Sequence, residues 1–208
     1  MTRNDRLARL LHVLRHGEIL AAEVSLRQSR MAPAPWMTRA LRVQAAQERG
    51  HAAIAGVALQ LVGEPAPAPD TTRALRRRLA CDLDAGDLAA SMVGLQGVVE
   101  HLGEALLDAL GACHHPAGAV LHALRRKVLM QERGHVQLGA RCLHTLALDS
   151  NARTPRAAAF DDYRALGVAA AGDVASLLDD GRLDAQAFWR DVDARLARWH
   201  VASRPQPS

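Results

Sequence analysis

Hydrophobic residues recur every three or four positions along most of this chain, which is the spacing of helices with one buried face. One long helix is predicted from about Asp5 to Arg30, and a second from about Trp36 to Val62. The stretch SRMAPAPW separates them, and the prolines of GEPAPAP at 63–69 end the second, because proline cannot continue a helix. The first part of the chain therefore predicts a helical hairpin.

The middle of the chain repeats this arrangement. Residues 70–85 are predicted to hold a short helix that begins after a good capping cluster at 70–72, and we expect this segment to be a crossover on the outside of the fold. The third long helix is predicted over 84–110 or 87–110, and the fourth over about 117–148. The stretch GACHHPAG separates these two helices, so a second hairpin is predicted.

Two shorter helices follow. The first is predicted to begin at Thr154 and Pro155, because proline suits the first position of a helix. Asp184 could cap the second. The predicted packing face of this last helix consists of Phe188, Trp189, Leu196 and Trp199.

The composition agrees with an all-α fold. Aromatic residues make up only 3% of the chain, and unbranched side chains, which lose little freedom in a helix, predominate. A chain of 208 residues with 49% hydrophobic residues can bury one sizeable core. We predict a four-helix unit over 1–150, appended helices over 151–201 and a disordered tail over 202–208.

Charge and cysteine content narrow the functional classes. The net charge is +4, and the one basic cluster, RALRRRL at 73–79, lacks the interleaved aromatic residues of a nucleic-acid surface, so Arg73, Arg76, Arg77 and Arg78 predict a solvated helix face. Three cysteines without CxxC spacing argue against disulfides and for the cytoplasm. No apolar run suggests a signal peptide or a membrane span, so a soluble protein is expected.

The pentapeptide QERGH occurs twice, at 47–51 and 131–135. Residues three apart share a helix face, so Glu48 lies beside His51, and Glu132 beside His135. A carboxylate and an imidazole side by side have the spacing of metal ligands. One such pair is a weak signal, whereas two at matching places in two hairpins form a pattern.

Each hairpin also offers a glutamate on its other helix. Glu18 and Glu48 stand 15 residues on either side of Pro33, and Glu100 and Glu132 stand 16 residues on either side of Pro116, so each pair is level in an antiparallel hairpin. A carboxylate on an apolar stripe is costly unless it is paired or binds a metal. Helical phase places His51 and His135 alone among the ten histidines on these carboxylate faces.

One glutamate from each of two helices and Glu-x-x-His from each of two others resembles the site of the ferritin-like di-iron carboxylate superfamily, built inside a four-helix bundle with a crossover connection. The resemblance covers about residues 5–149 and implies two iron ions, with manganese as an alternative. It implies that Glu18 and Glu100 are terminal or flexible ligands and that Glu48 and Glu132 bridge the ions. His51 and His135 would each bind one ion.

Four nearby residues could support such a site. Gln47 and Gln131 stand where many oxygenases of the superfamily have an aspartate that orients a histidine. Glu104 could be a second carboxylate near the metals or a solvated residue. Cys142 falls on the metal face, but a buried free cysteine is usually just a small apolar residue. Gly50 and Gly134, directly before the histidines, suggest close helix approach or access to the metal.

Among members of the superfamily, the chain is most similar to small single-subunit oxygenases and hydroxylases, which implies O₂ activation and oxidation of an organic substrate. Tyr163, the only tyrosine, lies beyond the fourth helix, which disfavours a radical-storing subunit. No flavin or nicotinamide fingerprint occurs, so an external reductase would supply electrons. Small residues that could leave a substrate pocket open are Ala22, Ala55, Gly97, Gly103 and Gly139.

Two other functions stay open at this point. One is a ferroxidase or iron-storage protein without an organic substrate, and the other is peroxide or catalase chemistry at a di-manganese centre. The appended helices could cap a substrate pocket or form a homodimer contact.

Overall fold

A computed structural model describes residues 3–62, 72–111, 116–148, 153–178 and 185–202, and every regular element in these ranges is helical. The prediction of an all-α chain is confirmed for them. The helices are α1 (Arg3–Met31), α2 (Pro35–Val62), α3 (Arg73–Asp84), α4 (Leu88–Met92), η1 (Val93–Val99), α5 (Glu100–Gly111), α6 (Pro116–Leu148), α7 (Arg153–Leu178) and α8 (Ala185–Ala202).

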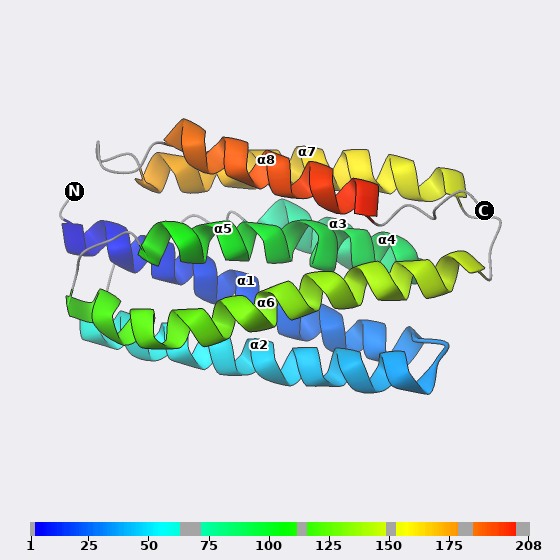
Figure 1. Ribbon diagram of the computed structural model, residues 1–208, viewed down its shortest axis with the longest axis horizontal. Helices are drawn as coiled ribbons and strands as arrows, with labels where there is room; N and C mark the ends of the chain where they lie inside the picture. The colour runs from blue at the N-terminus through cyan, green and yellow to red at the C-terminus, as the bar shows by residue number, and fades with distance from the viewer. Residues whose placement is uncertain (1–2, 63–71, 112–115, 149–152, 179–184, 203–208) are drawn as a thin grey trace.

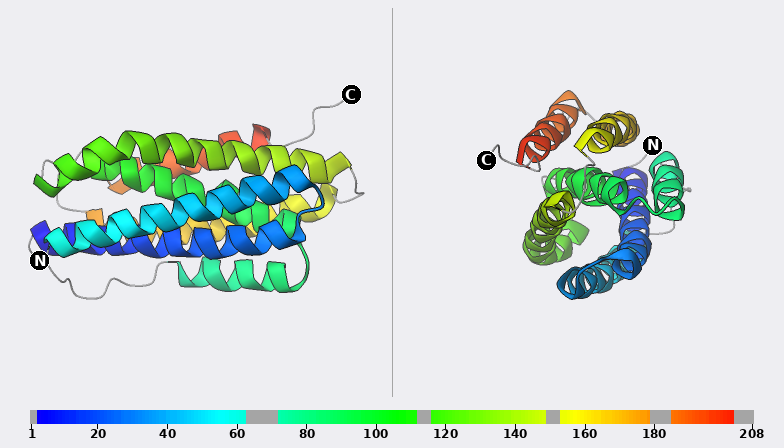
Figure 2. Two further views of the ribbon diagram at one scale, coloured as in Figure 1. Left: turned by 90° about the horizontal axis from the view of Figure 1, so that it is seen from below. Right: turned by 90° about the vertical axis from the view of Figure 1, so that its right-hand side faces the viewer.

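Four long helical runs lie side by side: α1, α2, the continuous run α4–η1–α5, and α6 (Figure 1). Helices α1 and α2 form one hairpin, while α5 packs against α6 in the other. The apolar stripes of these runs meet in a core that includes Leu11, Leu41, Leu95 and Leu143, each at most 2% exposed. Helices α7 and α8 lie together on one side of the other helices (Figure 2).

The third long helix differs from the uniform α-helix that its periodicity predicts. Its middle part, η1, is π-helical, and the backbone N–H of Glu100 donates to the carbonyl of Leu95, five residues earlier. Close packing accompanies this wider turn: a Cβ at Gly94 would lie 2.3 Å from the Tyr163 ring of α7. A π-turn shifts the residues that follow it around the helix axis, so it helps to set where Glu100 points.

Helices α4 and α3 differ in how their first turns are capped. Asp87 caps α4, because its side chain accepts a 2.8 Å hydrogen bond from the Ala90 backbone N–H. Thr72 stands before α3 but makes no side-chain capping bond, so that prediction is wrong for Thr72. Asp70 and Thr71 lie outside the described residues.

The basic cluster of α3 is only partly a solvated face. Leu75, Leu79 and Leu83 fix α3 on the core. Arg78, however, lies over the Tyr163 ring at 5.3 Å and reaches Asp162 at 2.7 Å. Arg76 pairs with Glu23 at 3.0 Å. These two arginines therefore join α3 to α7 and α1.

The appended helices pack on the predicted unit. Phe188 and Leu196 of the predicted α8 face are buried, while the side chains of Trp189 and Trp199 lie outside the described residues, as does the cap position Asp184. Arg195 joins α8 to α5 through Glu104 at 3.0 Å and Asp108 at 2.8 Å. The predicted tail over 202–208 also falls outside the described residues, except for Ala202 at the end of α8. The domain boundary near residue 150 stays a prediction.

Candidate metal centre

The four long runs bring all six predicted ligand residues together in the interior. Two overlapping groups have ligand atoms within 4.8 Å of one another. Every member of both groups is buried. The first group is Glu18, Glu48, His51 and Glu132, and the second is Glu48, Glu100, Glu132 and His135.

His51 turns its Nδ1 atom toward three carboxylates. This atom lies 3.4 Å from Glu18 Oε2, 3.2 Å from Glu48 Oε2 and 3.0 Å from Glu132 Oε1. One imidazole N–H cannot donate along three directions at once. The Nδ1 atom and these three oxygens therefore face a common point.

His135 has the same arrangement on the other side. Its Nδ1 atom lies 2.8 Å from Glu48 Oε1, 3.4 Å from Glu100 Oε2 and 3.9 Å from Glu132 Oε2. Glu48 and Glu132 thus offer one oxygen to each histidine, whereas Glu18 approaches only His51 and Glu100 only His135. This is the placement expected of two bridging and two terminal carboxylates.

The donor set fits a pair of divalent ions. An octahedral ion with bonds of about 2.1 Å holds neighbouring ligand atoms about 3 Å apart, which matches most of the separations around each Nδ1 atom. Four carboxylates and two neutral imidazoles would neutralise two divalent ions. Oxygen-rich sets with imidazole suit iron or manganese.

Without metal, the six side chains would share protons. Burial and the Glu132 charge hold the pKa of Glu18 well above its usual range, and burial and the Glu48 charge do the same for Glu100. Burial opposes the imidazolium forms, but the surrounding carboxylates raise the pKa of both His51 and His135 overall. Glu48 and Glu132 keep lowered pKa values despite burial, because the histidines and neighbouring hydrogen bonds favour their charged forms.

The glutamines of the two pentapeptides bind the histidines crosswise. His51 Nε2 lies 2.9 Å from Gln131 Oε1, and His135 Nε2 lies 2.8 Å from Gln47 Oε1. A glutamine carbonyl can only accept, so each Nε2 carries the proton and each Nδ1 is left to bind a metal. Each QERGH therefore supplies a glutamate and histidine to the centre and orients the histidine of the other, which gives a physical reason for the repeat.

Replacing Gln131 tests this crossed support. We expect Gln131→Met to weaken metal binding by about tenfold or more, because His51 loses the acceptor that fixes its tautomer and ring orientation. Metal titration of the folded protein measures the effect. Gln60→Met, an exposed change on α2, is the matched control. Equal affinities in both variants would contradict the orienting role.

Two of the predicted supporting residues, Glu104 and Cys142, lie apart from the ligand groups. Glu104 is buried but pairs with Arg195, and Cys142 is fully buried, with a pKa raised to about 12 by burial. Among the described residues, neither is part of a group that could hold a metal. Gly50 and Gly134 are exposed, and a Cβ at either would meet nothing within 4 Å, so the suggestion of close helix approach there is wrong.

The sequence analysis missed a chain of buried amides beside the centre. Gln44 Nε2 donates to Glu100 Oε1 at 2.7 Å and to Glu48 Oε1 at 3.2 Å. Gln96 Nε2 donates to Gln44 Oε1 at 3.1 Å and to Gln28 Oε1 at 2.9 Å. The signal available in the sequence was glutamine on an apolar stripe, at positions 44 and 96, four residues before a ligand glutamate.

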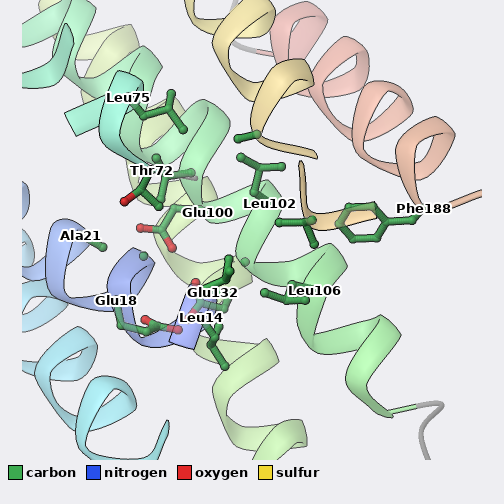
Figure 3. A pocket seen from close by; sticks show the side chains of 16 residues that line it. Leu14, Glu18, Ala21, Thr72, Leu75, Glu100, Leu102, Leu106, Glu132 and Phe188 are labelled. Carbon is green, nitrogen blue, oxygen red and sulfur yellow. The ribbon is translucent and has the colours of Figure 1, made fainter. Parts of the chain in front are cut away.

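A mostly apolar cavity adjoins the centre. Glu18, Glu100 and Glu132 line it together with side chains from α1, α3, α5, α7 and α8 (Figure 3). The volume of this cavity is about 50 Å³, enough for about four water molecules. Its apolar lining includes Leu14, Ala21, Leu75, Leu106, Val174 and Phe188.

The predicted pocket residues are mostly not those of this cavity. Only Gly103 of the five lines it, whereas Ala22, Ala55, Gly97 and Gly139 do not. Gly139 instead allows α6 to approach η1, because a Cβ there would lie 2.3 Å from Gln96 Cβ. The appended helices were predicted to cap a pocket or to form a homodimer contact, and their residues Ala170, Val174 and Phe188 line this cavity.

No protein-family model matches the chain, and no curated protein matches it significantly. None of the helices in the described ranges has the length and apolar character needed to cross a membrane.

Proposed function

We propose that the chain is a di-iron oxidoreductase of the ferritin-like kind, in which α1, α2, α4–η1–α5 and α6 form the four-helix bundle and the segment between α2 and α4 is the crossover. Glu18, Glu48, His51, Glu100, Glu132 and His135 would hold two iron ions. When bound, such ions supply O₂ activation. The support is the pair of ligand groups that share Glu48 and Glu132.

The reaction proposed is oxidation of an apolar organic substrate. The character of the cavity is the reason for preferring this reaction. It touches three ligand carboxylates, while the rest of its lining is almost entirely aliphatic or aromatic. An iron ion on its way to a storage core needs polar groups along its path, so such a lining suits a small hydrocarbon group better. A ferroxidase is therefore the second candidate.

The residues of this chain would have distinct tasks. Gln47 and Gln131 fix the histidine orientations, and the aliphatic wall of Leu14, Leu106 and Val174 excludes water from a bound substrate. Phe188 of α8 closes one side of the cavity (Figure 3). Electrons would come from a separate reductase protein.

The deciding experiment combines metal content, oxygen uptake and size. After anaerobic loading with Fe(II), we expect two irons per chain, a small oligomer, and O₂ consumption that rises when small alkanes or aromatic compounds are supplied together with a chemical reductant. Assembly into a large shell with more than two irons per chain would favour a ferroxidase. A preference for manganese and rapid peroxide breakdown would favour catalase chemistry.

Filling the cavity should separate substrate binding from metal binding. A Cβ at Gly103 meets only Glu132 Oε2, at 3.9 Å, so Gly103→Leu extends into the cavity without displacing backbone. We expect this variant to keep two irons but to lose at least about tenfold in affinity for xenon or a small hydrocarbon. The matched control is Gly172→Leu on α7, where the site is exposed and open. Unchanged binding in Gly103→Leu would remove the cavity from the proposal.

A further inference from the structure

The amide chain beside the centre has a fixed direction. Gln28 Nε2 donates to Ser91 Oγ at 3.3 Å and to Gln96 Oε1 at 3.3 Å, so each of the three glutamines uses both amide hydrogens. The three glutamines and Ser91 are each at most 1% exposed. Reversing Gln44 would place its carbonyl oxygen against the carboxylates of Glu48 and Glu100. The N–H groups of Gln44 are therefore held toward the metal centre.

This support exists on one side of the centre only. Glu48 and Glu132 hold equivalent positions in the two hairpins. The residue four positions before them, however, is Gln44 in α2 and Val128 in α6. The residue four positions before Glu100 is Gln96, whereas Leu14 precedes Glu18 in the same way. Val128 and Leu14 are buried and apolar. Of the hydrogen bonds recorded for the described residues, those from outside the ligand set reach Glu48 and Glu100 but not Glu18 or Glu132.

We infer that the two metal positions are inequivalent, with Gln44 as the positioning residue that makes the Glu100–His135 position the tighter one. The inference rests on the proposed di-metal function. By donating to Glu100 Oε1, Gln44 leaves Oε2 to face His135, so this carboxylate is oriented before a metal arrives. Among the described residues, Glu18 receives no such hydrogen bond from outside the ligand set. Both Glu18 and Glu100 border the apolar cavity, so this bond is what distinguishes the two carboxylates.

The consequence is an order of filling. A preoriented carboxylate loses less conformational freedom on binding, so the Glu100–His135 position binds the first ion. The Glu18–His51 position binds the second ion more weakly. Its carboxylate is free to change its binding mode beside the cavity, where a substrate would enter.

Titration of the whole metal-free protein with Mn(II), with free ion followed by electron paramagnetic resonance, tests the order. We expect two steps separated by about tenfold or more in affinity, because hydrogen bonds to charged groups are strong. Glu18→Ala should keep the tight step, and Glu100→Ala should lose it. Two equal steps in the parent protein, or loss of the tight step in Glu18→Ala, would overturn the inference while leaving the di-metal site intact.

Gln44→Met isolates the positioning role, because methionine keeps the length of the side chain and removes its donors. We expect the tight step to weaken by about tenfold and approach the second step. Val128→Ala, at the matching position of α6, should leave the tight step unchanged. Gln28→Met, which breaks the far end of the chain, should lower thermal stability without this loss of affinity.

An unchanged tight step in Gln44→Met would overturn the assignment. If Gln28→Met weakened metal binding as much as Gln44→Met, general destabilisation would explain the effect and the positioning role would be wrong. A parent protein that binds no Mn(II) and no Fe(II) would instead overturn the proposed function itself.

Discussion

Glu48→Ala is expected to reduce the metal content from two ions per chain to essentially none, and Glu132→Ala is expected to do the same. Each of these residues belongs to both ligand groups, so either change removes a ligand from both ions at once. Loss of one carboxylate also leaves the charge of two divalent ions without full compensation in a buried site. Metal analysis after anaerobic loading with Fe(II) measures the result.

Two comparisons make this result specific. Glu23→Ala removes a glutamate whose side chain is 60% exposed and pairs with Arg76 on the surface, so metal content should not change. Glu48→Gln keeps the size of the side chain, and circular dichroism of all variants shows whether the helices persist. Equal metal content in Glu23→Ala, Glu48→Ala and Glu132→Ala would refute the assignment.

The six proposed ligands could be predicted from the sequence, because helical spacing and the positions of the turns can be read directly from the order of the residues. Glu48 lies beside His51 in any helix, and equal distances from Pro33 bring Glu18 level with Glu48 in any antiparallel hairpin. The sequence could thus predict which residues gather in the interior. Their role as metal ligands is still a prediction.

Features that depend on contacts between separate helices were not accessible in this way. The crossed bonds of Gln47 and Gln131 require the spacing and rotation of α2 against α6, which periodicity does not contain. The π-helical turn before Glu100 accompanies close packing of Tyr163 of α7 against Gly94. Glutamines at 44 and 96 interrupt an apolar stripe, but only the fold shows that they donate to one another and to carboxylates.

The cavity illustrates the same limit. Its carboxylate side could be foreseen from Glu18, Glu100 and Glu132, since these residues share the interior. Its opposite wall comes from α7 and α8, whose place on the bundle is fixed by pairs such as Arg195 with Asp108. A prediction based on small residues of the four long helices alone therefore selected Ala22 and Ala55, which do not line the cavity.

Metal removal is expected to make the stability of the protein fall as the pH rises above about 6. In the metal-free protein Glu18, Glu100, His51 and His135 all have raised pKa values, so the folded chain holds protons that the unfolded chain releases. Stabilisation from such groups is fully present when the pH is below their pKa values in the unfolded chain, about 4.5 for glutamate and 6.5 for histidine. It is lost as the pH rises toward their pKa values in the folded chain. The lowered pKa values of Glu48 and Glu132 act oppositely, and matter only in acid.

Two divalent ions would take the place of these four protons, so the metal-loaded protein should not lose stability over the same range. We expect the difference in melting temperature between loaded and chelator-treated protein to widen from pH 6 to pH 8. Calorimetric titration in two buffers of different ionisation enthalpy should show release of up to about four protons per two ions. At about a thousandfold excess of metal over Kd, each site would add about 4 kcal/mol to the free energy of unfolding. A metal-free protein whose melting temperature rises with pH, or binding without proton release, would show that these six side chains do not exchange protons for metal.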